Sequence, residues 1–171
     1  LARNLSLADT LGVKRLDGVS LQLRAGEIVG IAGVSGNGQS ELLDVLSGMV
    51  APDAGELMLG GVQHTPRHWL DPAGARRARL AHVPEDRHRR GLVLPFMAWE
   101  SAVLGYQNLR RYCRGGWMRR AAMRTDTAEM MQRYDVRPPD PMLRSSKFSG
   151  GNQQKLVLAR EALPQPLVLL V

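Results

Sequence analysis

An apolar run that leads straight into a glycine-rich loop and then into a helical pattern is the feature that most restricts this sequence. Residues 28–32 read Ile-Val-Gly-Ile-Ala, which is typical of a strand buried on both faces. Residues 33–40 contain three glycines, and residues 41–46 carry apolar side chains at helical spacing as far as Gly48. A strand, a glycine loop and a helix in this order predict a protein of the α/β class.

The spacing within this loop suits the binding of phosphate. Gly33 and Gly38 match the pattern G-x-x-x-x-G-K-[ST], and Ser40 stands where a hydroxyl binds Mg²⁺. In that pattern the glycines let backbone N–H groups converge on anionic oxygens at a helix N-terminus. Gln39 replaces the lysine of the pattern. The lost charged hydrogen bond is worth ~1.5 to 3 kcal/mol, or roughly one to two decades of affinity. A glycine-rich turn that binds nothing is the alternative interpretation.

A second helix start also combines a hydroxyl with glycines. Residues 148–155 read Phe-Ser-Gly-Gly-Asn-Gln-Gln-Lys, and Ser149 can cap a helix that we expect over residues 150–163. Such a start is most often only a cap, but it also leaves N–H groups for an anion. Here it follows a helical region and precedes a run at residues 167–171 that is typical of a buried strand.

The strands expected elsewhere are short. Val19, Leu21 and Leu23 alternate with polar residues and predict a half-buried strand. Turn signals on both sides of a strand at residues 56–59 predict a small antiparallel attachment, and residues 80–83 predict a further strand.

The second half of the chain is expected to be mainly helical. Residues 96–134 have a largely helical pattern, with a break at Gly115-Gly116 and a second helix over residues 121–134. Residues 138–141 read Pro-Pro-Asp-Pro and form a stiff linker.

Composition excludes several other classes of protein. The chain has 171 residues, of which 44% are apolar and 23% charged, which excludes disordered and collagen-like chains. No apolar run approaches the ~18 residues of a membrane-spanning helix. Cys113 is the single cysteine, so no internal disulfide is expected and the cytosol is the default compartment. The net charge of +7 favours anionic partners.

Three segments together resemble the nucleotide-binding domain of an ABC transporter. They are residues 33–42, residues 83–94 (Val-Pro-Glu-Asp-Arg-His-Arg-Arg-Gly-Leu-Val-Leu) and residues 148–155. They are similar to the second, C-terminal ATP-binding half of bacterial importers for simple sugars and nucleosides, and residues 83–90 lean toward the nucleoside branch. The resemblance implies an α/β P-loop domain of the ABC ATPase type, with an antiparallel β attachment and an inserted α-helical subdomain.

The same resemblance implies a division of the chain. Residues 1–94 would form the nucleotide-binding core with the antiparallel β subdomain, residues 95–147 the helical subdomain, and residues 148–171 the signature helix and the start of the next strand. The missing initiator Met and the strand-like end predict a C-terminally truncated piece of a longer polypeptide, cut before the acidic residues that bind metal and activate water. We therefore expect no catalytic residue in the chain and no ATP turnover by it alone.

The resemblance also implies which residues bind ATP and Mg²⁺. In this family each ATP lies between the glycine loop of one domain and the signature segment of its partner. The loop residues expected to bind nucleotide are Gly33, Ser35, Gly36, Asn37, Gly38, Gln39, Ser40 and Glu41. The signature residues expected to reach the partner's nucleotide are Ser149, Gly150, Gly151, Asn152 and Gln153. Ser40 is the expected Mg²⁺ ligand, and Glu85, in the loop after Pro84, is either a second ligand or a solvated carboxylate.

Departures from the family pattern predict two unequal sites. Gln39 weakens this chain's own loop while residues 149–151 are intact, so the chain would complete a competent site on its partner and contribute a poor one itself. Residues 1–32 contain no aromatic side chain to stack on adenine, which leaves Val13 and Leu16 as aliphatic candidates.

Partners and location follow from the same resemblance. The chain would pair with the first ATP-binding half of the same polypeptide or with a homologous copy. It would also bind transmembrane permease subunits through its helical region and serve a solute-binding protein indirectly, and nucleic acid is not expected. The expected protein is a peripheral ATPase on the cytoplasmic face of the bacterial inner membrane, which couples ATP binding and hydrolysis to solute uptake. A catalytically silent regulatory module and a soluble ABC-type ATPase acting on nucleic acid are the alternatives.

Arginines and aromatic residues of the helical region have several interpretations. Trp99, Tyr106 and Trp117 would serve either the docking interface or the core. We expect no zinc site, because the four histidines lack metal-ligand spacing with Cys113. Two arginine-rich stretches either face solvent or contact nucleic acid, lipid headgroups or an acidic partner helix. Their members are Arg87, Arg89, Arg90, Arg110, Arg111, Arg114, Arg119 and Arg120.

Overall fold

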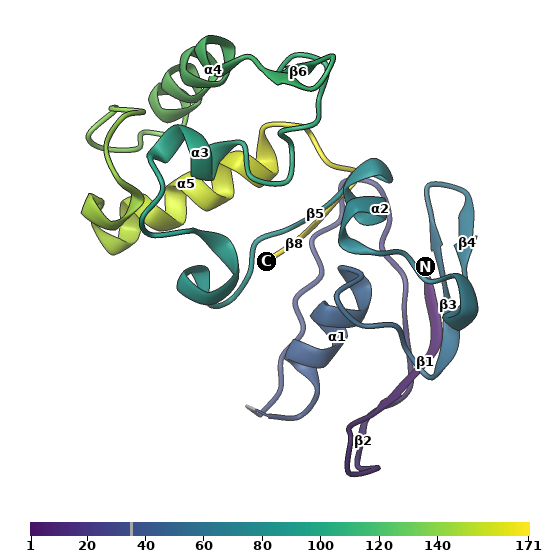
Figure 1. The fold of residues 1–171 in the computed structure, drawn as a ribbon. Helices are drawn as coiled ribbons and strands as arrows, with labels where there is room; N and C mark the ends of the chain where they lie inside the picture. Colours follow the sequence, from purple (N-terminus) through teal and green to yellow (C-terminus); the bar gives the residue numbers. More distant parts are fainter. Residues whose placement is uncertain (35) are drawn as a thin grey trace. The chain divides into compact units, whose positions relative to one another are not determined.

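The computed structural model describes residues 1–34 and 36–171. They form two compact units, one of residues 1–80 with Leu170 and one of residues 81–169 with Val171. Figure 1 shows that strands dominate the first unit and helices the second. The glycine loop belongs to the first unit, and the Ser-Gly-Gly segment belongs to the second.

The first unit contains a four-stranded antiparallel sheet in the order β2-β1-β3-β4. Its strands are β1 (Ala2–Ala8), β2 (Lys14–Leu21), β3 (Ala54–Leu59) and β4 (Val62–His64). The sheet confirms the predicted antiparallel attachment, but β2 starts earlier than the predicted strand and ends before Leu23. The sequence pattern did not indicate β1, because its two buried residues, Ala2 and Leu5, are three positions apart and do not follow the period of two. Its register against β2 also shifts at three places.

α1 (Gln39–Leu46) follows the glycine loop and ends where the sequence predicts. Gly48, just beyond its C-terminus, has φ +81°, and a Cβ there would lie 2.8 Å from the carbonyl oxygen of Leu70. Trp69 Nε1 donates to the carbonyl oxygen of Val45 at 2.9 Å and so ties the following segment to α1. That segment holds η1 (Pro66–His68) and α2 (Pro72–Arg77).

The apolar run at residues 28–32 does not form the buried strand that we predicted. Residues 22–34 hold no strand, and Ile28 is 98%, Ile31 54% and Val34 74% exposed. A strand buries both faces only when other strands flank it and helices cover it. No described segment pairs with this run. Its apolar composition predicted a buried strand, but the neighbouring strands that would bury it are not there among the described residues.

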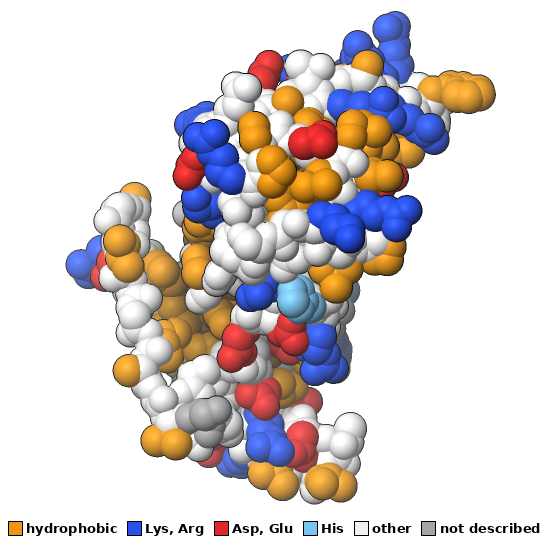
Figure 2. All heavy atoms as spheres, turned by 90° about the vertical axis from the view of Figure 1, so that its left-hand side faces the viewer, with side chains coloured by type: hydrophobic (Ala, Val, Ile, Leu, Met, Phe, Trp, Pro, Cys, Tyr) orange, Lys and Arg blue, Asp and Glu red, His pale blue; other side chains and the backbone are white. Residues whose placement is uncertain are grey.

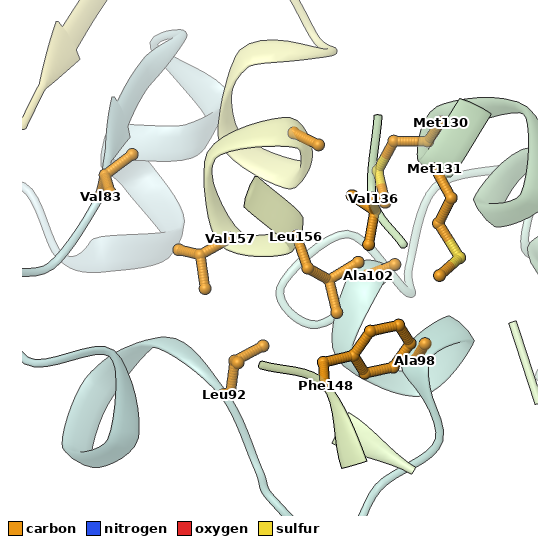
Figure 3. Packing of buried hydrophobic residues seen from close by; sticks show 11 residues of the cluster. Val83, Leu92, Ala98, Ala102, Met130, Met131, Val136, Phe148, Leu156 and Val157 are labelled. Atoms are coloured by element: carbon orange, nitrogen blue, oxygen red, sulfur yellow. The ribbon is translucent and has the colours of Figure 1, made fainter. Parts of the chain in front are cut away.

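The second unit is built around α5 (Gly150–Ala162), which packs against α3 (Ala98–Ala102) and α4 (Arg120–Arg133). α4 and α5 confirm the two helices predicted at residues 121–134 and 150–163. Figure 3 shows Leu156 and Val157 of α5 among apolar side chains from the surrounding elements. The buried cluster comprises Val83, Leu92, Ala98, Ala102, Met130, Met131, Val136, Phe148, Leu156, Val157 and Ala159.

Residues 96–134 are less helical than their pattern indicated. α3 has only five residues, and Gly105 soon after it has φ +86°, a left-handed conformation that a right-handed helix cannot continue through. The chain then enters a hairpin of β6 (Cys113–Arg114) and β7 (Trp117–Met118), whose turn is the predicted break at Gly115-Gly116.

The remaining elements are short. β5 (Leu80–His82) and β8 (Val168–Leu170) pair in a two-stranded sheet and confirm two predicted strands. Only part of the final run is buried as expected: Leu170 is 9% exposed, whereas Leu167 is 57% and Val171 78% exposed. A π-helical turn, η2 (Arg87–Gly91), follows β5, and η3 (Ser145–Lys147) precedes α5. Within the described residues, every helix is too short or too polar to span a bilayer.

Candidate functional site

The start of α1 offers backbone donors without a side-chain cap. Its N-cap residue, Gly38, has φ +94°, and Gly36 has φ +86°, both in the left-handed region that favours glycine. No described side chain caps the first turn of the helix. A Cβ on Gly38 would lie 2.5 Å from the carbonyl oxygen of Arg15 on β2, so only glycine fits there. Ser35, an expected nucleotide-binding residue, lies outside the described residues.

Gln39 bends back over the loop. Its Nε2 donates to the carbonyl oxygen of Val34 at 3.2 Å, and the N–H of Asn37 donates to the same oxygen at 3.2 Å. A Cβ on Gly33 would collide with this Nε2, so the amide rests against Gly33. The first turn of α1 therefore carries a neutral amide where the phosphate pattern has an ammonium, and Glu41 adds a negative charge. The backbone of the loop suits an anion, whereas its side-chain charge does not.

The loop residues fit ATP and Mg²⁺ through their backbone and hydroxyl groups. Two left-handed glycines and an uncapped helix start suit phosphate oxygens. Ser40 is exposed on the first turn of α1 and carries an oxygen of the kind that Mg²⁺ prefers. Of the two aliphatic candidates for the base, Val13 is 51% exposed and Leu16 only 4%, so only Val13 has side-chain surface to offer. The described residues hold no cluster of three metal-ligating side chains.

The start of α5 differs from that of α1 because a side chain caps it. Ser149 Oγ accepts from Asn152 N at 3.5 Å and from Asn152 Nδ2 at 2.9 Å, which confirms the predicted cap. Asn152 Oδ1 accepts from the N–H of Arg137 at 2.8 Å. Ser149, Gly150 and Gly151 are exposed, and a Cβ on Gly151 would meet no described atom within 4 Å. The helix start thus presents open backbone that Asn152 holds in place.

Gln153, in the first turn of α5, connects this helix to η2 and η3. Its side chain is only 6% exposed, and its Nε2 donates to the carbonyl oxygen of Ser145 in η3 at 3.1 Å. Its Oε1 accepts from Arg87 Nε at 3.3 Å and lies 2.8 Å from His88 Nε2. The segment that contains Pro-Glu-Asp-Arg therefore packs against α5. Sequence analysis missed this contact, because residues 66 positions apart leave no local signal.

Arg87 places a positive charge beside the exposed glycines. A Cβ on Gly150 would lie 2.9 Å from Arg87 Nη2. Asp86 caps η2, since its Oδ1 accepts from the backbone N–H groups of His88 at 2.9 Å and Arg89 at 3.1 Å. The bond from Arg89, followed by that from His88, lowers the pKa of the Asp86 carboxyl and keeps it ionised.

The two helix starts consequently differ in charge, which is neutral to negative at α1 and positive at α5. Glu85 is exposed between β5 and η2 and belongs to the second unit, whereas Ser40 belongs to the first.

Comparisons with known proteins cover both the glycine loop and the Ser-Gly-Gly segment. The family model for ABC transporters matches residues 16–171. The guanosine import ATP-binding protein NupO of Bacillus subtilis (strain 168) is 37% identical over 166 residues, which are 97% of this chain and 32% of NupO. The xylose import ATP-binding protein XylG of Burkholderia cenocepacia (strain HI2424) is 41% identical over 160 residues, which are 92% of this chain and 30% of XylG. The chain thus spans about a third of the length of these curated relatives.

A solved structure shows the same fold. The ATP-binding cassette MJ0796, in a dimeric post-hydrolysis state bound to ADP and Pi, superposes with a TM-score of 0.77 at 21% identity, covering 98% of this chain and 71% of that one. This likeness confirms the predicted α/β P-loop fold of the ABC ATPase type. With the family match over most of its length, the chain belongs to the ABC transporter family.

Proposed function

We propose that this chain is an ATP-binding domain of an importer for nucleosides or simple sugars and couples ATP binding and hydrolysis to solute uptake. The observation that carries the proposal is the presence, in one chain, of two helix starts beside exposed glycines: Gly36 precedes the uncapped start of α1, and Gly150 and Gly151 follow Ser149 at the start of α5. A domain with a glycine loop and a signature segment serves two nucleotides in a paired assembly. The names of NupO and XylG, which refer to the import of guanosine and xylose, support the class of solute.

Each start has its own task in this assembly. The N–H groups of Gly36, Gly38 and the first turn of α1 bind the phosphates of one nucleotide, and Ser40 holds its Mg²⁺. Residues 149–151 bind phosphate oxygens of the nucleotide on the partner, where Arg87 adds positive charge. Bound ATP supplies the free energy of domain closure and phosphoryl transfer. Closure is transmitted through the helical region to the membrane subunits.

The two sites are unequal in this proposal. Gln39 and Glu41 weaken the hold of this chain's loop on anions, whereas Ser149, Gly151 and Arg87 favour the partner's nucleotide. The chain then corresponds to the second ATP-binding half of the importer's energising protein. Its partners are the first half or a homologous copy, permease subunits at the cytoplasmic face of the membrane, and indirectly a solute-binding protein.

Solute uptake by proteoliposomes that contain the assembled transporter tests this function. We expect ATP-dependent uptake of a nucleoside or a pentose. Ser149→Arg should abolish it, because a bulky side chain then fills the exposed start of α5. A matched change five residues further along, Gln154→Arg, leaves the exposed glycines clear and should preserve uptake. Uptake of neither solute class, or full uptake with Ser149→Arg, contradicts the proposal.

A catalytically silent regulatory module is the second candidate, favoured by the neutral amide of Gln39 within the loop. Single-turnover ATP hydrolysis, measured with each glycine loop of the assembled protein disabled in turn, separates the two functions. An active domain pair loses hydrolysis when the partner's loop is disabled while the signature of this chain is intact. If this chain is a silent module, the assembled protein shows no hydrolysis whichever of the two glycine loops is left intact.

A further inference from the structure

The hairpin of β6 and β7 exposes apolar side chains at the surface of the second unit. Trp117 is 82%, Leu109 52% and Met118 51% exposed. The other two aromatic residues considered for docking pack inward: Trp99 is 6% exposed, and Tyr106 donates from its hydroxyl to Glu161 Oε2 at 3.0 Å. Trp117 is therefore the most exposed of the three aromatic residues considered for docking.

Positive charge surrounds this tryptophan. Residues 109–124 contain six arginines and no acidic residue. Arg111 pairs with Asp126, and the Arg124 guanidinium lies 5.3 Å from the centre of the Trp99 ring. The other four arginines are exposed and have no acidic partner among the described residues; they are Arg110, Arg114, Arg119 and Arg120. Figure 2 shows basic and apolar side chains interspersed over the second unit, at the top of that view.

The base of the hairpin is fixed while its tip is free. Arg119 N donates to the carbonyl oxygen of Tyr112 at 2.8 Å and closes the base. The Arg111–Asp126 ion pair fastens the hairpin to α4. Gly115 and Gly116, both with positive φ, form the turn at the tip, where a Cβ on either would meet no described atom within 4 Å.

We propose that this basic hairpin, residues 109–120, binds the anionic headgroups of the membrane on which the transporter works, with Trp117 entering the headgroup layer. Arginines without acidic partners attract a negatively charged lipid surface. Tryptophan favours the membrane interface because its ring is apolar and its N–H is polar. Charge complementarity and a projecting tip favour a lipid surface over a protein groove. The inference rests on the proposed function, which brings the domain to the cytoplasmic face of a membrane.

Vesicle sedimentation of the full chain, without permease, tests the inference. We expect binding to vesicles of phosphatidylglycerol and phosphatidylcholine in equal parts, and little binding to phosphatidylcholine alone. Each basic residue near an anionic surface strengthens attachment roughly five-fold, so Arg114→Gln with Arg120→Gln should weaken it roughly thirty-fold. Trp117→Ala should weaken it several-fold while leaving the charge unchanged. The matched control, Arg89→Gln with Arg144→Gln, removes two exposed charges elsewhere in the second unit and should bind like the wild type.

Three outcomes would overturn the inference: equal binding to neutral vesicles, equal losses in the hairpin and control variants, and attachment that appears only when permease is present. The last would identify the hairpin as a protein-docking surface. ATP hydrolysis by the assembled transporter, measured in parallel, separates the two proposals. Intact hydrolysis without lipid binding removes only the lipid proposal, and lipid binding without ATP binding or hydrolysis removes the proposed function.

Discussion

We expect Gln39 to determine how tightly the glycine loop of this chain can hold a triphosphate. Its amide donates to the carbonyl oxygen of Val34 and rests against Gly33. The loop keeps the left-handed glycines that a phosphate-binding loop requires, yet it lacks the cation that compensates phosphate charge. In the proposed function, the loop therefore holds ATP through backbone donors and the Ser40 hydroxyl, without a side-chain cation.

Gln39→Lys should tighten ATP binding at this loop. A charge-assisted hydrogen bond contributes ~1.5 to 3 kcal/mol, so we expect a gain of roughly ten- to a hundred-fold. Titration with a fluorescent ATP analogue, with the partner's own loop disabled, measures the change. Gln39→Leu is the control, because it removes the amide without adding charge and should bring no gain. Equal affinities for Gln39→Lys and the wild type would show that the missing ammonium is not the cause.

Asp126 should make the second unit sensitive to acid. The hydrogen bonds from Arg111, and then from Tyr112, lower the pKa of its carboxyl. Because the pKa is lower in the folded chain than in the unfolded one, the stabilisation is complete above about pH 4 and is lost as the pH falls through the folded pKa. Asp126→Asn should lower the melting temperature at neutral pH by roughly 2 to 4 °C. It should also make the melting temperature fall less steeply as the pH is lowered into the acid range.

Thermal unfolding followed by circular dichroism, from neutral pH to below about pH 4, measures the pH dependence of the melting temperature. Asp140→Asn, which changes an exposed carboxyl in the linker, is the comparison. Parallel acid limbs for Asp126→Asn and the wild type would mean that the ion pair contributes nothing. The pKa of Tyr112 gives a second readout. Burial, and then the bond to Asp126, raises this pKa to about 12, so Asp126→Asn should lower it.

The start of α5 depends on a buried polar connection. Gln153 is bonded to η3 and η2 at once, and Ser145, whose carbonyl oxygen it satisfies, is fully buried. Replacing Gln153 by leucine leaves that carbonyl with only the 3.4 Å bond from the N–H of Phe148 and removes the acceptor of Arg87 Nε, which should destabilise the fold by about 2 kcal/mol. The neighbouring Gln154 is exposed, so Gln154→Leu should change stability by less than ~0.5 kcal/mol. Denaturant unfolding of both variants measures the difference, and equal effects would refute the assigned role of Gln153.

The sequence predicted elements best where local signals determine them. The cap at Ser149, the end of α1 at Gly48 and the helices α4 and α5 follow from capping residues and helical periodicity. The buried strand at residues 28–32 was wrong, because burial on two faces depends on neighbours that a local pattern does not encode. Contacts such as Arg87 with Gln153 were missed for the same reason. The hairpin was interpreted as a helix break, since its glycines indicate a turn without indicating which partners it joins.

At the scale of the whole molecule, two helix starts of opposite electrostatic character define the proposed role. The loop at α1 combines open backbone with Gln39 and Glu41, and the start at α5 combines open backbone with Arg87. In the proposed function, a domain with this asymmetry would contribute more to its partner's nucleotide than to its own. The net charge of +7 does not distinguish the two helix starts. The charged side chains that lie near each start do.

ATP hydrolysis by the assembled protein carrying Gly151→Asp tests this account most directly. A side chain at Gly151 meets no described atom, and an aspartate near a helix N-terminus stabilises the helix, so the variant should fold normally. Its carboxylate would stand where phosphate oxygens bind, and we expect hydrolysis to fall by roughly a hundred-fold, which is ~2.7 kcal/mol. Gln154→Asp, with the same charge on an exposed position one turn along, should keep hydrolysis within about two-fold of the wild type. Unchanged hydrolysis with Gly151→Asp would show that the start of α5 does not bind phosphate.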